Sequence, residues 1–483
     1  MAKIALLYFD VSTGYYPSFH HGIAFLIGAL HHHHEIVFHH LARPEQIQHV
    51  STSLADEHAD IVGLSFTTNQ VRHLKEFLKI WKRRDEKLVI AGGVHPTLER
   101  EKILEQFPEI DGVCVGEGEH PFVSLCRKIE QKEDYLPTPS FIFRKGEQIV
   151  KNPVMEPPNI EGLSFPDYSM FDYKKIIRDN GNCFPMMLSR GCPYNCSYCC
   201  NHAFRKIYQD SGKYVRMPSP AHGIALIQNN LKLYPETKKM VFADDTFTWN
   251  KKWLKEFCEL YRRSIHLPFE CNARVETVDD EIAATLKSAG CVSVSLGIES
   301  GNEWLRMNIL NRKHSNHVIQ QAFSIMKSHN IKTSTSNMIG LPFETKTMAK
   351  DTLLLNKQLS PDYGGCCYFY PFPGTYLFDL CVKYRMIGEN IENMSGYFEG
   401  PSLKPLFMTT KETIGICNKI NMYFSARFIV SKMKLPLIVE NFIINLFFIF
   451  RYPLMKIINR GEKSWALKKT RAFLRKIAIR YFR

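Results

Sequence analysis

The sequence predicts an α/β protein with two successive α/β domains and a mostly helical C-terminal region. Short apolar runs alternate with helical patterns over residues 1–145 and again over residues 181–385, which favours parallel sheets covered by helices. The length of 483 residues accommodates two or three domains, each with its own core. Hydrophobic residues make up 45% of the chain, the ordinary share for a folded soluble protein.

The first predicted domain covers residues 1–145 and contains a doubly wound parallel sheet. Its strands are expected at Lys3–Phe9, Glu35–His40, Ile61–Phe66, Leu88–Ala91 and Gly112–Val115. Its helices are expected at Gly22–Leu30, Gln70–Trp81, Leu98–Phe107 and Pro121–Gln131. In such a sheet, ligands bind beyond the carboxyl ends of the strands.

Small and polar residues gather at the predicted carboxyl ends of these strands. Glycine lets a backbone approach a bulky ligand closely, and a hydroxyl group can bond the amide edge of a ligand. The Gly-x-Gly-x-x-Gly fingerprint of dinucleotide-binding sheets is absent after the first strand. Ordinary turn geometry is the alternative explanation for each residue. The candidate ligand-binding residues of this domain are Ser65, Thr67, Gly92, Gly93, His95, Gly116 and Glu117.

Residues 146–180 are expected to connect the two domains. The stretch from Leu136 to Tyr173 has two short β-like runs and is rich in proline, which is typical of a connecting segment. The prolines are Pro153, Pro157, Pro158 and Pro166.

The second predicted domain covers residues 181–385 and contains six strand–helix units. Strands are expected at Pro185–Ser189, Lys239–Ala243, Phe269–Ala273, Val292–Ile298, Lys332–Met338 and Cys366–Tyr370. Helices are expected at Ala221–Leu233, Lys252–Ser264, Asp279–Ser288, Ser315–Ser328 and Lys346–Leu359. Parallel strands covered by helices can close into a barrel, whose reactive groups lie at the carboxyl ends of the strands.

The first strand of this domain is followed by three cysteines with the spacing Cys-x-x-x-Cys-x-x-Cys, namely Cys192, Cys196 and Cys199. A structural zinc ion usually takes four protein ligands, so three are too few. Three thiolates suit a cubane iron–sulfur cluster whose fourth iron stays open for a substrate. A zinc site that borrows Cys200 or His202 is the alternative, and it is disfavoured because adjacent cysteines cannot easily bind one metal ion.

The cysteine motif follows an apolar strand, Phe184 to Leu188, and includes the aromatic Tyr198. In these features it resembles the motif of the radical S-adenosylmethionine (SAM) superfamily. The six strand–helix units resemble the partial (β/α)6 barrel of that superfamily. The resemblance implies a 4Fe–4S cluster on the three cysteines and a SAM molecule at the strand ends.

The resemblance also implies cofactor-binding roles for polar residues at the strand ends. Asp244 and Asp245 stand where the superfamily usually has a Gly-Gly-Glu-type motif that meets the methionine amino group, and a carboxylate can accept bonds from an ammonium. Arg274 can hold the methionine carboxylate through two parallel bonds. An ordinary surface or capping role is the alternative for each residue. The other expected cofactor residues are Asn272 beside Arg274, Glu299 for a ribose hydroxyl or a cation, Gly340 for adenine, and Tyr198.

The first domain precedes this motif and resembles the Rossmann-like cobalamin-binding domain found ahead of many radical SAM enzymes. The likeness is carried by the segments Gly-Gly-x-His-Pro and Gly-Glu-Gly-Glu, which begin at Gly92 and Gly116. The Asp-x-His-x-x-Gly motif, which supplies an axial imidazole in other cobalamin proteins, is missing. The resemblance therefore implies that cobalamin binds without a protein histidine on cobalt.

Residues 386–483 are expected to form a mostly helical region with a basic tail. From Arg451 to Arg483 there are eleven Lys or Arg and one acid, Glu462, so this end carries most of the net charge of +14. From Trp465 onward the pattern predicts an amphipathic helix suited to an anionic membrane surface. Packing of its apolar stripe on the barrel is equally favoured, and nucleic-acid binding is disfavoured because no RNA-binding module accompanies the charge. The apolar run Leu435–Phe450 is too interrupted to span a membrane.

The resemblance implies a cobalamin-dependent radical SAM enzyme, with methyl transfer to an unactivated carbon as the expected reaction. In that reaction the cluster gives one electron to SAM, the resulting 5′-deoxyadenosyl radical removes a substrate hydrogen, and cobalamin delivers a methyl group. The alternatives are cyclisation or rearrangement without methyl transfer, and a cobalamin-binding sensor or scaffold without catalysis. A methylthiolating enzyme would need a second cysteine trio in the first domain, which Cys114 and Cys126 do not supply.

The expected partners are a small-molecule or lipid-like substrate and a one-electron reductant such as flavodoxin or ferredoxin. The fourteen cysteines are irregularly scattered, and the start of the chain does not resemble a signal peptide. Both features favour the reducing cytoplasm. The basic tail adds the expectation of peripheral contact with the inner face of the membrane.

Overall fold

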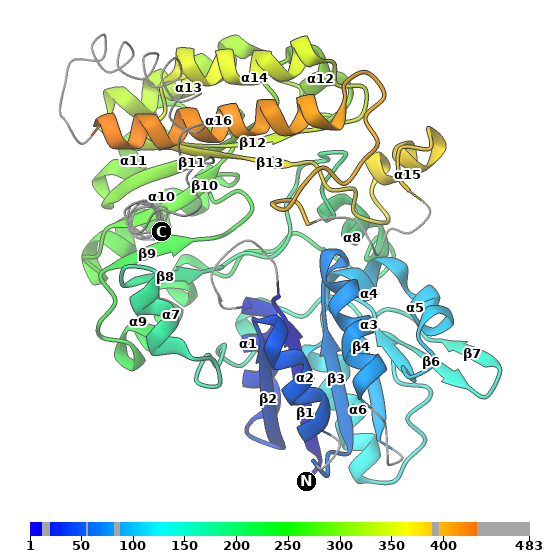
Figure 1. Cartoon of the computed structure of the whole chain (residues 1–483). Coiled ribbons are helices and arrows are strands. Elements are labelled where there is room, and N and C mark those ends of the chain that lie inside the picture. Colours follow the sequence, from blue (N-terminus) through cyan, green and yellow to red (C-terminus); the bar gives the residue numbers. More distant parts are fainter. Residues whose placement is uncertain (12–19, 55–56, 82–86, 389–395, 432–483) are drawn as a thin grey trace, which may run out of the picture.

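The computed structural model describes residues 1–483 apart from 12–19, 55–56, 82–86, 389–395 and 432–483 (Figure 1). Two α/β regions follow one another in the chain, and each is built on its own sheet. The predicted amphipathic helix and the apolar run Leu435–Phe450 lie outside the described residues. Among the helices that are described, none is long and apolar enough to cross a membrane.

The N-terminal sheet has seven strands in the order β2-β1-β3-β4-β5-β6-β7. Its parallel strands are β1 Lys3–Phe9, β2 Glu35–Leu41, β3 Ile61–Ser65, β4 Leu88–Gly92 and β5 Gly112–Cys114. Its helices are α1 His21–Leu30, α2 Pro44–Ser53, η1 Thr68–Gln70, α3 Val71–Ile80, α4 Val94–Glu99, α5 Glu101–Gln106 and α6 Glu119–Glu130. The chain turns from β1 to β2 on one side and continues to β3 on the other. This places the topological switch point, where such sheets bind ligands, between β1 and β3.

Alternate side chains of β1 enter two different cores. Ile4 and Leu6 belong to the core that includes α1 and α6, whereas Ala5 and Leu7 belong to the core that includes α2 and α3. Successive residues of a strand point to opposite faces of the sheet, so both faces are covered by helices. The predicted doubly wound architecture is confirmed.

The structure differs from the sequence prediction at three places in this region. Helix α2 is not predicted, because its sequence is polar and it buries only Ile47, Val50 and Ser51. The single helix expected at Leu98–Phe107 is two short helices, α4 and α5, which meet at Arg100 with a φ of 55°. The strands β6 Phe141–Lys145 and β7 Gln148–Lys151 form an antiparallel hairpin that extends the sheet. The sheet therefore continues past residue 145 into the segment expected to be a connection.

The second sheet has six parallel strands in the order β13-β12-β11-β10-β9-β8 and forms an open half-barrel. The strands are β8 Cys183–Met186, β9 Lys239–Phe242, β10 Phe269–Ala273, β11 Cys291–Glu299, β12 Lys332–Ile339 and β13 Tyr363–Tyr368. The helices between them are α8 Asn201–Ile207, α9 Pro220–Leu233, α10 Lys251–Ser264, η3 Val275–Thr277, α11 Asp280–Ser288, α12 Glu303–Asn308, α13 Asn316–Ser328 and α14 Lys346–Leu359. The predicted partial (β/α)6 barrel is confirmed.

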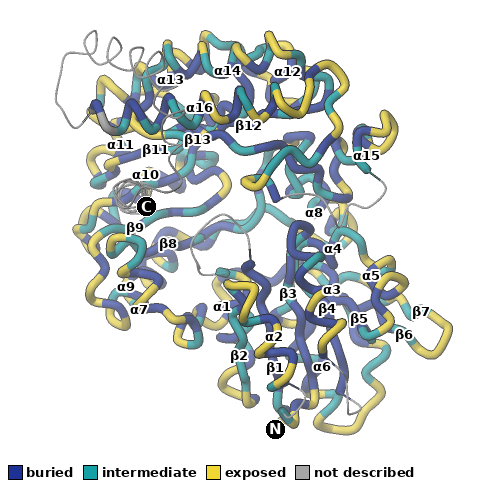
Figure 2. The backbone as a smooth tube through the Cα atoms, viewed as in Figure 1, coloured by how far each residue is buried: buried dark blue, intermediate teal, exposed yellow. Residues whose placement is uncertain are grey.

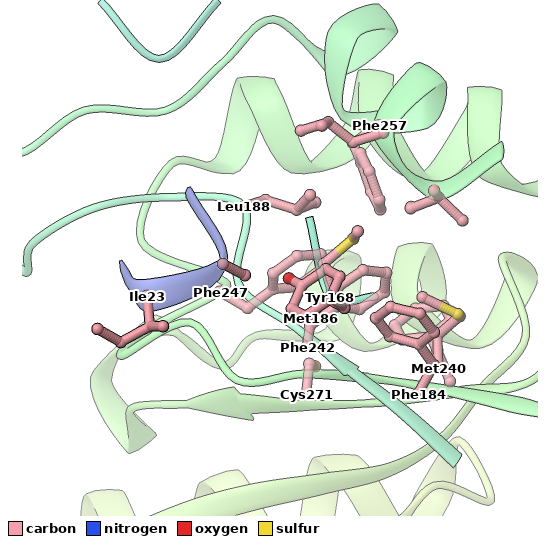
Figure 3. Close-up of a cluster of buried hydrophobic side chains, with 14 of the residues drawn as sticks. Ile23, Tyr168, Phe184, Met186, Leu188, Met240, Phe242, Phe247, Phe257 and Cys271 are labelled. Atoms are coloured by element: carbon pink, nitrogen blue, oxygen red, sulfur yellow. The ribbon is translucent and has the colours of Figure 1, made fainter. Parts of the chain in front are cut away.

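One continuous buried cluster joins the two α/β regions. It includes Ile23 of α1, Tyr168 of the connecting segment, and Phe184 and Phe242 of the barrel strands (Figure 3). The connecting segment contains η2 Ile160–Gly162 and α7 Tyr173–Asp179. It packs so closely on α1 that a Cβ at Gly28 would lie 2.3 Å from the Phe165 carbonyl oxygen. This segment therefore contributes side chains to the packed core, although buried and exposed residues alternate along it (Figure 2), as in α7, where Ile176 is buried and Lys175 is exposed.

The described C-terminal region contains α15 Tyr376–Lys383 and α16 Thr410–Ser431. Helix α16 covers β13, the edge strand of the half-barrel, and buries Ile420, Tyr423 and Phe424. A Cβ at Gly364 would lie 2.4 Å from the Phe424 ring, so glycine is what lets the helix approach this strand. A covered edge strand does not offer its free backbone groups to another chain.

Candidate active site

The loop between β8 and α8 carries the three cysteines of the motif. Cys192 and Cys196 are buried, and Cys199 is half-buried. Arg205 of α8 reaches back to this loop and donates to the three successive carbonyl oxygens of residues 192–194, at 2.9 to 3.1 Å. A loop without regular structure needs such donors for its buried carbonyl groups. Arg205 therefore fixes the shape of the loop, a role that the sequence pattern does not reveal.

Each of the three cysteine sulfurs lies beside a polar side chain from elsewhere in the chain. The contacts are Arg274 Nη1 to Cys196 Sγ (3.0 Å), Asn201 Nδ2 to Cys199 Sγ (3.4 Å) and Thr246 Oγ1 to Cys192 Sγ (3.6 Å). Hydrogen-bond donors and positive charge favour the thiolate, which is the form of cysteine that binds metal. The donor set around the three sulfurs fits an iron–sulfur cluster.

Cys199 and Cys200 differ in their tendency to ionise. A hydrogen bond from the Cys200 thiol lowers the pKa of Cys199 to about 7, and the same bond raises the pKa of Cys200 well above its ordinary value. No three His, Cys, Asp or Glu side chains in the described part of the chain converge on a single ion position. A cubane cluster does not need this convergence, because each thiolate binds a different iron.

Two buried guanidinium groups flank Cys196. Arg274 pairs with Glu276 at 2.5 Å in addition to its contact with the sulfur. Arg312 lies 4.0 Å from the same sulfur and donates to the Tyr198 hydroxyl at 3.2 Å. Neither arginine has a hydrogen-bond partner for its Nε among the described residues. Buried cations with unused donors suit an anionic ligand beside the cysteine loop. Arg312 stands outside any motif, so the sequence does not single it out.

The two adjacent aspartates after β9 have different environments. Asp244 is fully buried, and its carboxylate accepts hydrogen bonds from the Leu188 N–H and from the N–H and hydroxyl of Ser189. Burial raises the pKa of Asp244 to about 6, although these donors oppose the shift. Asp245 is exposed, and Asn201 Nδ2 donates to it at 3.0 Å. Asp244 therefore holds the start of the cysteine loop, whereas Asp245 has free acceptor capacity.

Two further predicted residues end neighbouring strands of the half-barrel. The side-chain amide of Asn272 donates to the Asp244 carbonyl oxygen at 3.1 Å. Glu299 is half-buried and has a left-handed φ of 65°. Burial raises the pKa of its carboxyl, although Arg312, at 3.6 Å, opposes that shift. Arg312 thus connects Glu299 with Tyr198 beside the cysteine loop.

Gly340 ends β12 in the left-handed conformation, with a φ of 84°. Its N–H donates to Glu344 Oε2 at 2.7 Å, and the N–H of Leu341 donates to the same atom at 3.3 Å. Glu344 is buried, and burial raises the pKa of its carboxyl to about 8. The backbone N–H of Gly340 therefore already donates a hydrogen bond within its own turn. Glu344 forms this turn, although no motif in the sequence singles it out.

An apolar cavity of about 220 Å³ lies at the carboxyl ends of the parallel strands of the N-terminal sheet. Five of the seven residues predicted for this domain line it: Ser65, Gly92, Gly93, Gly116 and Glu117. Its opposite wall comes from the barrel region, through Arg190, Phe204, Tyr208 and Tyr214. The cavity therefore lies where the two α/β regions meet. Arg190 in its wall stands two residues before Cys192 in the chain.

The other two predicted residues of the domain do not line this cavity. Thr67 donates through its hydroxyl to Asn69 at 2.6 Å in the turn before α3. His95 is buried, and one of its ring nitrogens lies 3.1 Å from the Thr68 hydroxyl. The one histidine in the cavity wall among the described residues is His20, whose Nδ1 accepts from the Ile23 N–H at the start of α1.

The glycines at the cavity serve different purposes. Gly93 has a φ of 97°, and a Cβ there would lie 3.1 Å from the Phe66 carbonyl oxygen. Gly116 has a φ of 87°, and a Cβ there would lie 2.0 Å from the Tyr208 hydroxyl oxygen. The Tyr208 hydroxyl also accepts from the Glu117 N–H at 2.6 Å. The missing side chain at Gly116 thus makes room for a tyrosine of the barrel region rather than for a ligand.

A buried charge network joins the two regions at the cavity wall. Arg190 donates to Glu117 at 2.5 Å and to Glu119 at 2.6 Å, and Arg216 binds the second oxygen of Glu117. The exposed fractions of these four side chains lie between 4% and 16%. Burial alone would raise the pKa of the Glu119 carboxyl, but Arg190 holds it below its ordinary value. We call Arg190, Arg216, Glu117 and Glu119 the interdomain charge network.

The chain matches two known protein families. Residues 11–126 match the B12 binding domain, residues 186–355 match the radical SAM superfamily, and the two matches together cover more than half of the chain. The fold and the cysteine site therefore define a radical SAM enzyme with an N-terminal B12-binding domain. The chain belongs to the cobalamin-binding radical SAM family, and its domains use a 4Fe–4S cluster, SAM and cobalamin.

Several relatives are 26% to 28% identical to this chain over the matched residues. An uncharacterized methyltransferase of Pyrococcus horikoshii is 26% identical over 76% of this chain and 79% of its own. An anaerobic magnesium-protoporphyrin IX monomethyl ester cyclase of Rubrivivax gelatinosus is also 26% identical, over 74% of this chain and 64% of its own length. The cobalamin-dependent radical SAM methyltransferase TokK of Streptomyces tokunonensis is 28% identical over 29% of this chain and 22% of its own.

Solved structures share the fold at lower identity. The cobalamin-dependent SAM radical enzyme OxsB, with aqua-cobalamin bound, superposes with a TM-score of 0.68 over 99% of this chain and 76% of its own, at 15% identity. The radical SAM methyltransferase TsrM of Kitasatospora setae superposes with a TM-score of 0.64 over 80% of this chain and 77% of its own, at 16% identity. At these identities the likeness establishes the fold.

Proposed function

We propose that this protein is a cobalamin-dependent radical SAM methyltransferase that methylates an unactivated carbon of a small or lipid-like molecule. The observation that carries the proposal is the cavity shared by the two regions. Residues Ser65, Gly92 and Glu117 of the cobalamin-binding domain and Arg190 beside the cysteine loop line the same cavity. Methyl transfer of this kind needs both cofactors at one place, and the fold brings their two domains together there.

When bound, the cluster and SAM supply a hydrogen-abstracting 5′-deoxyadenosyl radical, and cobalamin supplies the methyl group. The protein holds these groups in place. We assign iron binding to Cys192, Cys196 and Cys199, whose sulfurs each lie beside a polar side chain. The buried wall of the cavity keeps water away from reactive intermediates, which would otherwise be quenched.

We assign the methionine end of SAM to Asp245 and Arg274. Asp245 is exposed and has acceptor capacity left for an ammonium, whereas the carboxylate of Asp244 is occupied by Leu188 and Ser189. Arg274 has an unused Nε for a carboxylate. The remaining SAM contacts in this proposal come from Tyr198, Asn272, Glu299 and the backbone at Gly340.

Replacing Asp245 by asparagine is expected to weaken SAM binding about 10- to 100-fold, because a hydrogen bond to a charged group contributes about 1.5–3 kcal/mol. Equilibrium binding of SAM to the cluster-loaded protein measures the effect. The matched control is Asp244→Asn, which should lower the melting temperature and leave the dissociation constant of SAM within a few-fold. Weaker SAM binding in the Asp244 variant alone would contradict the assignment.

The reaction class is tested by product analysis without knowledge of the substrate. The anaerobically reconstituted protein, given SAM, cobalamin and a reductant, is expected to form both 5′-deoxyadenosine and S-adenosylhomocysteine. The second product arises because a second SAM molecule restores the methyl group on cobalamin. Mass spectrometry identifies both products directly, and a deuterated methyl group on SAM follows the methyl group that is transferred to cobalamin. The absence of 5′-deoxyadenosine would contradict the proposal that the protein is an enzyme and would favour a sensor or scaffold.

A second candidate is a cyclisation or rearrangement without methyl transfer. This candidate is supported by similarity to the cyclases of Rubrivivax gelatinosus and Cereibacter sphaeroides, which are 26% identical over 74% and 83% of this chain. A cyclase of this kind would form 5′-deoxyadenosine and no S-adenosylhomocysteine. The same product analysis therefore separates the two candidates. A cytoplasmic location and contact of the tail with the membrane stay predictions.

A further inference from the structure

A second cavity, of about 620 Å³, adjoins the cysteine loop. It is lined by Asn195 and Ser197, which flank Cys196 in the chain, and by parts of α8, α12 and α15. The full lining is Asn195, Ser197, His202, Arg205, Lys206, Gln209, Asn308, Ile309, Asn311 and Tyr376. None of these residues lines the first cavity or belongs to the residues assigned to SAM. The cavity is therefore separate from the proposed cofactor sites.

This cavity opens to solvent and has an exposed aromatic side chain at its edge. Tyr376 at the start of α15 is 60% exposed, and Asn195, Lys206, Asn308 and Asn311 are also exposed. Helices α8 and α15 lie side by side there (Figure 1), and the Tyr376 N–H donates to His202 Nε2 at 3.4 Å. Exposed aromatic residues with a polar surround are typical of surfaces that bind another protein.

The surface is held rigidly against the cysteine loop. The N–H of Ser197 donates to the Leu310 carbonyl oxygen at 3.1 Å, and the carbonyl oxygen of Ser197 accepts from Leu377 at 3.0 Å. The side chain of Asn311 donates to the Asn195 carbonyl oxygen at 2.7 Å. Since Asn195 and Ser197 are the direct chain neighbours of Cys196, this surface adjoins an assigned cluster ligand. Such closeness suits the transfer of an electron from outside.

The charge of the cavity is positive. Arg205 and Lys206 are the cations of its lining, and the lining contains no carboxylate. Arg205 contacts the cysteine loop directly through the carbonyl oxygens of residues 192–194. Complementary charge raises the rate at which an acidic partner associates and fixes its orientation.

We propose that this surface binds an acidic electron-transfer protein that carries a flavin or an iron–sulfur group. The proposal rests on the proposed function, because it requires a redox cluster on the three cysteines. The partner gives one electron to the cluster, which passes from the 2+ to the 1+ state. For a flavin partner, the anionic hydroquinone becomes the neutral semiquinone, and no proton is transferred. Lys206 and Tyr376 are the residues that contact the partner.

The test uses full-length, cluster-loaded protein and flavodoxin in its hydroquinone form. Lys206→Glu is expected to slow cluster reduction by flavodoxin about tenfold at low salt, and to weaken flavodoxin binding by a similar factor. Added salt should slow the wild-type reaction and affect the variant less, because surface charges are screened. Tyr376→Ala should also slow the reaction. Reduction by titanium(III) citrate, a small chemical reductant, should be the same in all variants.

The matched control is Lys232→Glu, which makes the same charge change at an exposed position on α9 outside the cavity. It should leave both reduction rates unchanged. Equal flavodoxin rates in the Lys206 and Lys232 variants would overturn the proposal. Equal slowing with both reductants in the Lys206 variant would also overturn it, since the loop itself would then be disturbed. Cluster reduction and flavodoxin binding are measured without turnover, so a failure of methyl transfer leaves this test intact.

Discussion

Alanine at Cys192, Cys196 or Cys199 is expected to abolish formation of 5′-deoxyadenosine. Each thiolate binds a different iron of the cluster, so the loss of one leaves a second iron without a protein ligand. The iron content should fall from about four atoms per chain to a small fraction of that number. Iron analysis and the visible absorption of the reconstituted protein measure the loss of the cluster, and product analysis measures the loss of 5′-deoxyadenosine.

The neighbouring cysteine provides the control. Cys200→Ala should retain the cluster, because the thiol of Cys200 donates to Cys199 and its pKa is raised by that bond. Cys183→Ala in β8 should also retain it, since this cysteine lies before the loop. A Cys200 variant that loses iron while the Cys199 variant keeps it would mean that the third ligand is assigned to the wrong residue.

Replacing Arg190 by methionine is expected to lower the free energy of unfolding by about 3–5 kcal/mol. The substitution removes the ion-pair partner of the buried Glu119, while Glu117 keeps Arg216. An unpaired buried carboxylate costs more than the pair itself contributes, because it cannot regain its hydration. Urea unfolding followed by tryptophan fluorescence measures the loss. Retention of cobalamin should fall as well, since Arg190 lines the cavity between the two regions.

Two further variants identify the cause of this effect. Adding Glu119→Gln to the Arg190 variant should restore part of the stability, because the buried charge is then removed. Arg263→Met removes an arginine whose pair with Glu259 lies on the surface, where Arg263 is 68% exposed. It should have no measurable effect, as is usual for exposed ion pairs. If the double variant were less stable than Arg190→Met, the loss would come from packing and the charge explanation would be wrong.

The sequence predicts most of the fold because its signal is local. Strands β1 and β10 and helix α14 have the bounds expected from the sequence. In these segments apolar residues recur with the period of a buried strand or a covering helix. The sequence does not predict helix α2 because its apolar pattern is too short. Of its apolar residues, only Ile47 and Val50, which are one helical turn apart, are buried. The hairpin β6–β7 is assigned to a connection because nothing local shows that it joins the N-terminal sheet.

The sequence also locates much of the candidate site. Strand ends converge at one edge of a parallel sheet, so Ser65, Gly92 and Gly116 can be expected near one another without coordinates. Thr67 and His95 belong to the same loops and yet bond to neighbouring residues of the turns. Which residue of a loop faces the cavity depends on the loop conformation, which residue spacing does not specify.

The sequence by itself determines the order of most of the elements, and its cysteine spacing indicates the class of cofactor, since these follow from short-range periodicity and from ligand number. Only the tertiary structure decides which side chains meet. Arg190 and Glu117 are 73 residues apart in the chain, and Arg312 and Cys196 are 116 residues apart, yet each pair is in contact. Such pairs form because burial of the apolar core brings distant segments of the chain together, and a buried charge then requires a partner within reach.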